Sequence, residues 1–223
     1  MLRFYVMLLP LLAAAVLILA AWVGGPQNAV DFAIVAESVK LRQANPLLTE
    51  LPAWLSLLGN AIVLLPLSAL VALALALIRR WRPALLLTVI VAGERLLLDG
   101  IKLLLGRARP DIAVHPVDTH SFSFPSGHAA NTMTVLVAIA LFALPARHRH
   151  WSVPLAVALA AAVGLTRPWL GVHWPSDVLG GWMLAALVLF AACWADRRWR
   201  ISDPGARTAA SDYSPASSAA RQG

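Results

Sequence analysis

The sequence predicts an all-α integral membrane protein, a bundle of six transmembrane helices with the N- and C-termini in the cytoplasm. Hydrophobic residues make up 60% of the 223 residues and charged residues only 13%, which is more apolar than a soluble domain. The apolar residues gather in six runs of about the length that crosses a bilayer. We expect one domain over residues 1–200 and a disordered cytoplasmic tail at residues 201–223, where Ala, Ser, Pro and Gly prevail.

The six apolar runs follow one another along the whole domain. They are Phe4–Val23, Trp54–Ile78, Ala84–Leu105, Gly127–Leu144, Ser152–Thr166 and Pro175–Ala195. The first run is too long for the apolar part of a signal peptide and has only Arg3 before it, so we expect a retained helix. Residues 24–53 should form an external loop, and its segment 30–41 has helical apolar spacing that suits the membrane interface.

Arginine clusters between the runs set the expected orientation. They precede run one, separate runs two and three and runs four and five, and follow run six, so six spans place all of them on one side. This side should be the cytoplasm. The clusters are Arg3; Arg79, Arg80 and Arg82; Arg147 and Arg149; and Arg197, Arg198 and Arg200. Topology therefore accounts for the net charge of +7, and we expect no nucleic-acid partner.

Four polar stretches meet at the opposite, outer face, because they lie where runs three and five end and where runs four and six begin. They are Lys102–Pro110, Pro125–His128, Thr166–Arg167 and His173–Asp177. The way in which the helices pack does not affect this conclusion, because the membrane face of each stretch depends only on the number of spans before it. The outer face is therefore where we expect the chemistry of this protein.

Three cations in these stretches, Lys102, Arg109 and Arg167, indicate an anionic ligand. Cations near a membrane ordinarily snorkel or set topology, but these lie on the side that the other basic clusters mark as external, as does Arg107. Arg suits bidentate binding of phosphate, and Lys supplies a point charge. On a continuing helix Lys102 and Arg109 would share a face, and Pro110 marks Arg109 as the place where the helix ends.

A helix N-terminus is expected at Ser126, between Pro125 and an apolar run. Ser126 is the natural N-cap, and no Glu or Gln three residues later closes a capping box. The free N–H groups of the first turn and the helix dipole then form an anion site. Gly127 lets a ligand approach the backbone, and His128 can give or take a proton there.

His173 and Asp177 are four residues apart, around the start of the last run. With Pro175 at the first helical position, the carboxylate can reach one imidazole nitrogen and leave the other as nucleophile or base. The alternative is that Asp177 only stabilises a helix start and His173 is an interfacial polar residue. Beside His128 and three cations, we favour phosphoryl transfer through a covalent intermediate.

A metal site is the competing chemistry for these histidines. Their spacings match no zinc pattern, and the single cysteine, Cys193, excludes a cysteine-based site. Lys and Arg already supply the positive charge that an anion needs. We therefore expect no metal and no other cofactor.

Together, Lys102-x6-Arg109-Pro110, Pro125-Ser126-Gly127-His128 and Arg167-x5-His173-x3-Asp177 resemble the three-part signature of the type 2 phosphatidic acid phosphatase (PAP2) superfamily, bacterial branch. The resemblance implies a six-helix membrane phosphatase that needs no metal. One departure is Thr166, where the family usually has Ser, and it bears on fine substrate geometry.

The resemblance also implies roles for the matching residues. His173 would form a phosphohistidine, Asp177 would orient it, and His128 would protonate the leaving group and then activate water. Phosphate oxygens would be held by the remaining signature residues, which are Lys102, Arg109, Ser126, Gly127 and Arg167. Outside the signature, Arg95 and Asp99 are four apart and are expected to pair within the bundle.

The predicted activity is hydrolysis of a lipid phosphomonoester or pyrophosphate at the outer face of a bacterial inner membrane, with undecaprenyl pyrophosphate as the favoured substrate. Phosphatidylglycerophosphate, phosphatidate and the 1-phosphate of lipid A stay open as alternatives, as do tail length and oligomeric state. A protein that only binds or moves phospholipid would need the cations but not both histidines. A vanadate-dependent haloperoxidase shares the phosphate-site residues but is soluble, which six spans argue against.

Overall fold

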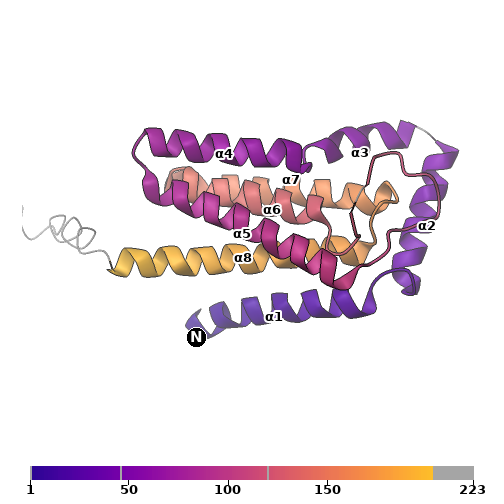
Figure 1. Cartoon of the computed structure of the whole chain (residues 1–223), viewed down its shortest axis with the longest axis horizontal. Coiled ribbons are helices and arrows are strands. Elements are labelled where there is room, and N and C mark those ends of the chain that lie inside the picture. Colours follow the sequence, from indigo (N-terminus) through magenta and orange to yellow (C-terminus); the bar gives the residue numbers. More distant parts are fainter. Residues whose placement is uncertain (1, 46, 120, 203–223) are drawn as a thin grey trace, which may run out of the picture. The chain divides into compact units, whose positions relative to one another are not determined.

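A computed structural model describes residues 2–45, 47–119 and 121–202, with side chains described between residues 8 and 200 of these ranges. All regular structure in the described residues is helical (Figure 1). The elements are α1 (Leu2–Val23), α2 (Ala29–Ala44), α3 (Leu47–Leu57), α4 (Ala61–Leu77), α5 (Trp81–Leu105), α6 (Gly127–Ala138), the π-helix η1 (Ile139–Ala143), the 3-10 helix η2 (Ala146–His148), α7 (Arg149–Trp169) and α8 (Pro175–Ser202). The predicted tail at residues 201–223 lies outside the described residues from residue 203 onward.

The chain divides into two compact units, residues 1–189 and residues 190–223. The first unit contains α1 to α7, the N-terminal part of α8 and every predicted site residue. The second contains the C-terminal part of α8, where Arg200 Nε donates to Asp196 Oδ2 at 2.8 Å, an i,i+4 pair on the helix surface.

Helix α6 is the centre of the first unit and packs against α4, α5 and α7 (Figure 1). Most of its side chains are small or β-branched, which lets helices approach closely. The buried ones are Ala129, Ala130, Asn131, Thr132, Thr134, Val135, Val137 and Ala138. Helix α8 also approaches the start of α6 closely, because a Cβ added to Gly181 would lie 2.6 Å from the Ser126 carbonyl oxygen. The predicted anion site at the start of α6 is therefore packed directly against α8.

The segment between the first two apolar runs is more ordered than the sequence indicates. An external loop at residues 24–53 is wrong in part, because helices α2 and α3 occupy most of it, while the helical spacing of residues 30–41 is confirmed. Asn28 caps α2 by accepting hydrogen bonds from the N–H groups of Val30 and Asp31. In Figure 1, α2 runs across the end of the other helices of the first unit.

The second apolar run contains a break that the sequence pattern does not reveal. Helix α3 ends at Leu57 and α4 begins at Ala61, with Asn60 as the N-cap, whose side chain accepts from Ile62 N–H at 3.0 Å. Gly59 in this break leaves no room for a side chain, since an added Cβ would lie 2.5 Å from Val163 Cγ1 and 3.0 Å from His128 Cδ2. The break therefore lies beside one of the predicted catalytic residues.

Helix α5 ends earlier than the spacing of Lys102 and Arg109 suggests. Gly106 terminates it with φ 55° and ψ 25°, a left-handed conformation that favours glycine. The prediction that Arg109 marks the helix end is therefore wrong, and Arg109 lies in the following loop. The loop lets Arg109 approach the site independently of the face of α5 that carries Lys102.

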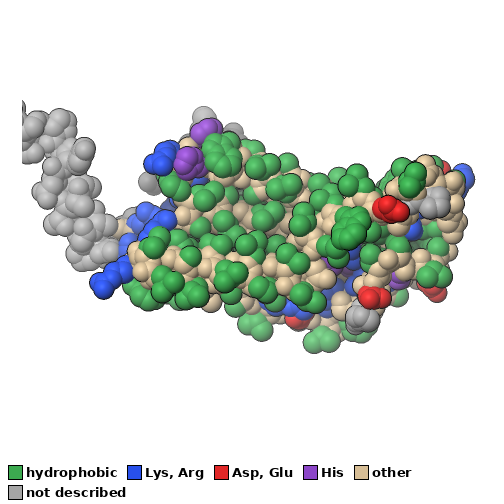
Figure 2. Space-filling model, turned by 90° about the horizontal axis from the view of Figure 1, so that it is seen from above, with side chains coloured by type: hydrophobic (Ala, Val, Ile, Leu, Met, Phe, Trp, Pro, Cys, Tyr) green, Lys and Arg blue, Asp and Glu red, His purple; other side chains and the backbone are tan. Residues whose placement is uncertain are grey.

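Long apolar helices and an apolar surface give the first unit the character of a membrane protein. Three helical segments are long and apolar enough to cross a bilayer, namely Leu47–Leu77, Ala146–Trp169 and Pro175–Arg200, and Leu8–Val23 and Gly127–Ala143 are shorter apolar helices. Helix α5 has 25 residues but carries four charged residues in its second half, Glu94, Arg95, Asp99 and Lys102. Hydrophobic side chains cover most of the flank seen in Figure 2. The count of six spans stays a prediction.

Candidate active site

His173 lies in the short connection between α7 and α8 and is 1% exposed. Its Nε2 is 2.9 Å from Arg109 Nη1, and its Nδ1 is 3.3 Å from both Asp177 Oδ2 and Ser123 Oγ. A guanidinium can only donate, so Nε2 accepts from Arg109, and the ring proton is on Nδ1. The lone pair of Nε2 therefore points toward Arg109.

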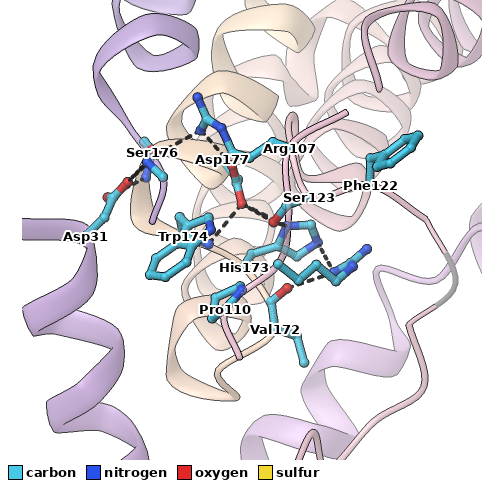
Figure 3. A network of polar contacts seen from close by, with 12 residues as sticks. Asp31, Arg107, Pro110, Phe122, Ser123, Val172, His173, Trp174, Ser176 and Asp177 are labelled. Atoms are coloured by element: carbon cyan, nitrogen blue, oxygen red, sulfur yellow. Dashed lines mark hydrogen bonds and ion pairs between the residues drawn. The ribbon is translucent and has the colours of Figure 1, made fainter. Parts of the chain in front are cut away.

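The Asp177 carboxylate is fully buried and holds the His173 ring from behind (Figure 3). Its Oδ2 accepts from the Ser123 hydroxyl at 2.5 Å and from the Trp174 backbone N–H at 2.9 Å, in addition to Nδ1 of His173. Its Oδ1 pairs with Arg107 Nη1 at 2.9 Å. Asp177 is in the first turn of α8 because Pro175 begins this helix. The predicted His–Asp contact is present in the structure.

Arg107 connects this carboxylate to the end of α1. Its Nη2 donates to the carbonyl oxygens of Ala20 and Ala21, and its guanidinium lies 4.4 Å from the centre of the Phe124 ring. An Arg on an aromatic face adds a cation–π contribution. Since Arg107 is almost completely buried, its charge balances Asp177 inside the protein rather than binding a ligand.

Asp31 of α2 secures the other side of the α8 N-terminus. It accepts from the Ser176 backbone N–H at 3.0 Å, from the Ser176 hydroxyl, and from the Gly25 N–H at 2.7 Å (Figure 3). An acidic side chain at a helix N-terminus is favoured by the helix dipole. Helices α1 and α2 therefore fix the position of the first turn of α8, where Asp177 lies.

On the opposite side, His173 faces a cavity of about 390 Å³. Six of the eight predicted site residues line it: Lys102, Arg109, Gly127, His128, Arg167 and His173. Basic and histidine side chains are visible within a hollow of the surface in Figure 2. The seventh, Ser126, is buried directly before Gly127, and the eighth, Asp177, lies behind His173. The structure thus brings all eight residues together from four elements and two loops.

The cations of the cavity are held by few protein groups. Lys102 Nζ donates to the Phe122 carbonyl oxygen, and Arg167 Nη1 donates to Ser56 Oγ. Arg167 Nε is buried and has no hydrogen-bond partner among the described residues. Such a donor is costly to bury unpaired, and an anion in the cavity would satisfy it.

Arg109 differs from the other two cations because it touches His173. It donates to the Val172 carbonyl oxygen at 2.7 Å and to the Ser121 carbonyl oxygen at 2.8 Å, in addition to its contact with Nε2. These bonds hold the Arg109 guanidinium beside Nε2 of the His173 ring. A phosphate placed against Nε2 would therefore meet Arg109 first.

The start of α6 has the backbone geometry expected of an N-terminus, but its cap differs from the prediction. Ser126 is at the N-cap position with φ −68° and ψ 116°, yet its side chain makes no capping hydrogen bond. Its buried hydroxyl oxygen has no partner among the described residues, and its backbone N–H donates to the Asp177 carbonyl oxygen at 2.9 Å. The hydroxyl and the first-turn N–H groups are thus left for a ligand.

The surroundings keep His173 in its neutral form. Burial lowers the pKa of His173 well below its ordinary value, and the positive charges of Arg109, Arg167 and Lys102 lower it further. Burial also lowers the pKa of Arg109, against the opposing charge of Asp177. A neutral imidazole with an unprotonated Nε2 is the form that can act as a nucleophile.

Two residues of the site escaped the sequence reasoning. Ser123 hydrogen-bonds both His173 and Asp177, and Arg107 pairs with Asp177. Ser123 directly precedes Phe124–His128, and Arg107 is two residues before Arg109, so closeness to the motifs could have drawn attention to both. No helical spacing in the sequence connects either residue to Asp177. In the described part of the chain, no group of three or more His, Cys, Asp or Glu is arranged as a metal site.

A neutral buried histidine backed by a carboxylate and facing three cations, on helices suited to a membrane, defines a phosphate-handling membrane enzyme. The sequence matches the PAP2 superfamily over residues 83–201. Phosphatidylglycerophosphatase B of Bacillus subtilis (strain 168) is 38% identical over 168 residues, 73% of this chain and 81% of that protein. An undecaprenyl-diphosphatase of Sulfolobus acidocaldarius is 30% identical over 196 residues, 84% of this chain and 89% of that protein.

The fold agrees with the sequence match. The crystal structure of a transmembrane PAP2 type phosphatidylglycerolphosphate phosphatase from Bacillus subtilis has a TM-score of 0.77 and 32% identity, covering 85% of this chain and 96% of that one. This chain belongs to the PAP2 superfamily and is a membrane-bound lipid phosphatase.

Proposed function

We propose that this protein hydrolyses a lipid phosphomonoester or pyrophosphate through a phosphohistidine at His173, at the periplasmic face of a bacterial inner membrane. One observation carries the proposal: Nδ1 of His173 is held by Asp177, while Nε2 faces a cavity lined by cations. This arrangement directs the nucleophilic lone pair toward the place where a phosphate would bind.

In the first step, the Nε2 lone pair of His173 attacks phosphorus and forms a P–N bond as the P–O bond to the lipid breaks. His128, which lines the same cavity, donates its proton to the departing lipid oxygen. Asp177 stabilises the positive charge that develops on the His173 ring through its contact with Nδ1. The lipid product leaves with the proton, and the phosphoryl group stays on His173.

In the second step, His128 is neutral and takes a proton from water as the water oxygen attacks phosphorus. The P–N bond breaks, the electron pair returns to Nε2, and inorganic phosphate is released. The net reaction consumes one water and returns both histidines to their starting protonation states. His128 thus acts as acid in one step and base in the other.

The phosphate oxygens would be held by Lys102, Arg109 and Arg167, together with the Ser126 hydroxyl and the first-turn N–H groups from Gly127 on. The unpaired Arg167 Nε and Ser126 Oγ support this assignment, because both could bond an oxyanion without breaking a protein hydrogen bond. Charge that spreads over the oxygens in the transition state is stabilised by such preorganised donors.

The proposed topology has six spans and both termini in the cytoplasm. Two basic connections lie together at the end of the first unit away from the cavity: Arg80 Nη1 donates to the Ala143 carbonyl oxygen at 2.8 Å, and Arg149 Nη2 to that of Leu141 at 2.6 Å. By the positive-inside rule this end is cytoplasmic. The cavity then faces the periplasm.

The substrate we favour is undecaprenyl pyrophosphate, with phosphatidylglycerophosphate, phosphatidate and lipid A 1-phosphate as alternatives. Relatives of this chain carry the names phosphatidylglycerophosphatase B, undecaprenyl-diphosphatase and lipid A 1-phosphatase, which supports lipids with a terminal phosphate as a class. We propose no metal and no other cofactor.

The proposal is tested by phosphate release from these four lipids in detergent, with and without EDTA. Wild type should release phosphate from at least one lipid, equally well in EDTA. His173→Ala should reduce kcat by about 10⁴-fold or more, as removal of a nucleophile does elsewhere. The matched control is His150→Ala, since His150 is an exposed histidine outside the site.

Each outcome addresses a different part of the proposal. Full activity of His173→Ala would show that His173 is not the nucleophile. Loss of wild-type activity in EDTA would show that the reaction needs a metal ion. A reporter fused after Arg200 should behave as cytoplasmic, and a periplasmic signal would refute the topology.

A further inference from the structure

An ion pair in the second half of α5 is not explained by the catalytic steps. Arg95 Nε donates to Asp99 Oδ2 at 2.8 Å, and the two side chains are 39% and 46% exposed. The predicted pairing is present, but the pair is not buried within the bundle. Charged residues on a membrane helix are costly and usually mark a ligand path, so a half-exposed pair here points to a ligand rather than to packing.

Arg95 lies at the boundary of two cavities. It lines the catalytic cavity together with Lys102, His128 and His173. It also lines a larger groove of about 790 Å³ between α4 and α5. The other residues of this groove are almost all apolar: Leu65, Ser68, Ala69, Ala72, Leu73, Ala76, Trp81, Ala84, Leu85, Thr88, Val91, Ala92 and Leu96. Among the described residues, Arg95 is the one that lines both spaces.

A lipid substrate needs a polar place for its headgroup beside an apolar place for its tail, and the two cavities that Arg95 lines have these characters. The occupant of the apolar groove that best matches its lining is the hydrocarbon tail of that substrate. A group between a phosphate in the catalytic cavity and a tail in this groove would then lie beside Arg95.

The distance between Arg95 and Lys102 along α5 would accommodate one further polar group of the headgroup beyond the scissile phosphate. Arg95 and Lys102 are seven residues apart, which is about 10 Å along the helix at 1.5 Å per residue. The Arg95 side chain reaches toward Asp99, one turn nearer to Lys102. Asp99 is three residues, about 5 Å along the helix, from Lys102, so the ion pair leads from Arg95 toward the end of α5 that carries Lys102.

The guanidinium of Arg95 also retains donors for a ligand. Asp99 binds Nε and is the only partner of Arg95 among the described residues, which leaves the two terminal amino groups. These groups can form the bidentate contact that Arg makes with phosphate. Asp99 neutralises Arg95 and holds its side chain along the helix.

We propose that Arg95 recognises a second phosphate, the one between the scissile phosphate and the hydrocarbon tail. The substrate class is then a lipid with two phosphates in series, either a diphosphate or a phosphomonoester followed by a phosphodiester. Phosphatidate carries one phosphate and gains nothing from Arg95. This inference rests on the proposed function and specifies its substrate class.

The test compares wild type and Arg95→Gln, as full chains, on undecaprenyl pyrophosphate, phosphatidylglycerophosphate and phosphatidate in one detergent. Arg95→Gln should lower kcat/KM by about 10- to 100-fold for the two-phosphate lipids, the size of a lost charged hydrogen bond. It should change kcat/KM for phosphatidate by less than about 3-fold, within the range of a surface substitution. The two-phosphate lipid with the larger loss identifies which of the two headgroups Arg95 binds.

Two further variants make the test independent of folding. Arg95→Lys keeps the charge but loses the bidentate geometry, so the selectivity should fall to an intermediate value. Arg147→Gln removes an exposed arginine at the other end of the first unit and should leave all three activities unchanged. Thermal unfolding in detergent verifies that each variant is folded.

Three results would overturn the proposal. An equal loss on all three lipids would make Arg95 a structural residue, and no loss on any would remove it from recognition. Wild type that prefers phosphatidate to both two-phosphate lipids would also contradict it. If the wild-type enzyme releases phosphate from none of the lipids, the proposed function itself is refuted, and this inference is refuted with it.

Discussion

The two sides of His173 are built in opposite ways. Behind the ring, Asp177 is bonded by Ser123, Trp174 and Arg107, and Arg107 in turn by carbonyl oxygens at the end of α1. In front of the ring, the cavity is lined by three cations, and buried atoms in or beside it have no hydrogen-bond partner among the described residues, namely Arg167 Nε, Ser126 Oγ and Asn131 Oδ1. The polar groups behind the ring bond one another, whereas those in front could bond an anion.

This difference separates positioning from binding. Substitutions behind His173 should act on stability and on kcat, because they disturb the orientation of the nucleophile. Substitutions in front should act chiefly on phosphate binding and on transition-state charge, and should cost little stability, since few protein contacts are lost.

Among the residues that surround His173, the largest effect on activity is expected in front of the ring, from Arg167→Ala. Loss of one preorganised donor to a developing oxyanion lowers kcat by about 10²- to 10³-fold. The unfolding temperature should not fall, since a buried charge without a counter-ion among the described residues is removed. Ser56→Ala is the matched control, because it removes only the protein partner of Arg167 and should cost less than about 10-fold, the size of one neutral hydrogen bond. Equal losses in the two variants would mean that Arg167 acts through packing.

A smaller loss of activity but a larger loss of stability is expected behind the ring, from Arg107→Ala. The variant leaves the Asp177 charge buried without its counter-ion, which costs about 3–5 kcal/mol. We expect kcat to fall by about 10- to 100-fold with KM nearly unchanged, as for a residue that orients a catalytic group. Arg107→Lys should restore part of kcat, and a loss confined to KM would contradict the positioning role.

The close contact between the starts of α6 and α8 gives the next prediction. Gly181→Ala would place a Cβ 2.6 Å from the Ser126 carbonyl oxygen, so the free energy of unfolding should fall by about 1–3 kcal/mol. Gly93→Ala is the control, because a Cβ there meets nothing within 4 Å, and it should be neutral or stabilising by up to about 1 kcal/mol. Thermal unfolding of both variants in detergent measures the difference.

The smallest effect concerns pH. Protonated His173 cannot attack phosphorus, but burial and the neighbouring cations hold its pKa well below 6.5, so the ring stays neutral as the pH falls through that value. The acid limb of kcat/KM should therefore show only the substrate phosphate, whose second pKa is about 6. A slope of one in log kcat/KM against pH would agree with a His173 ring that stays neutral. A slope of two near pH 6 would mean that His173 is also protonated there and would contradict this prediction.

The helices and the residues around the cavity could be predicted from the sequence better than the residues that hold the catalytic groups in position. Each apolar run corresponds to helix, because hydrophobic segments must satisfy their backbone internally. The break at Leu58–Asn60 was missed, since its apolar neighbours hide Gly59, which is required by the approach of Val163 and His128. The end of α5 was misplaced because the left-handed conformation of Gly106 outweighs the spacing of Lys102 and Arg109.

The supporting residues were missed for a different reason. Arg107 looks like one more external cation, and only the three-dimensional structure shows that it pairs with Asp177, 70 residues away. Asp31 bonds Ser176 across 145 residues. Such contacts leave no periodic trace in one sequence, whereas six residues that line the cavity belong to three short motifs that can be read directly.

In the proposed mechanism His173 carries the phosphoryl group, with Nδ1 held by Asp177 and Nε2 facing the cavity. This is tested by a rapid alkaline quench of the enzyme turning over a lipid labelled in its terminal phosphate, followed by peptide mapping. We expect label on the peptide that contains His173, and none in His173→Ala. Label on Ser123 or His128, or turnover by wild type with no labelled peptide at any time, would contradict it.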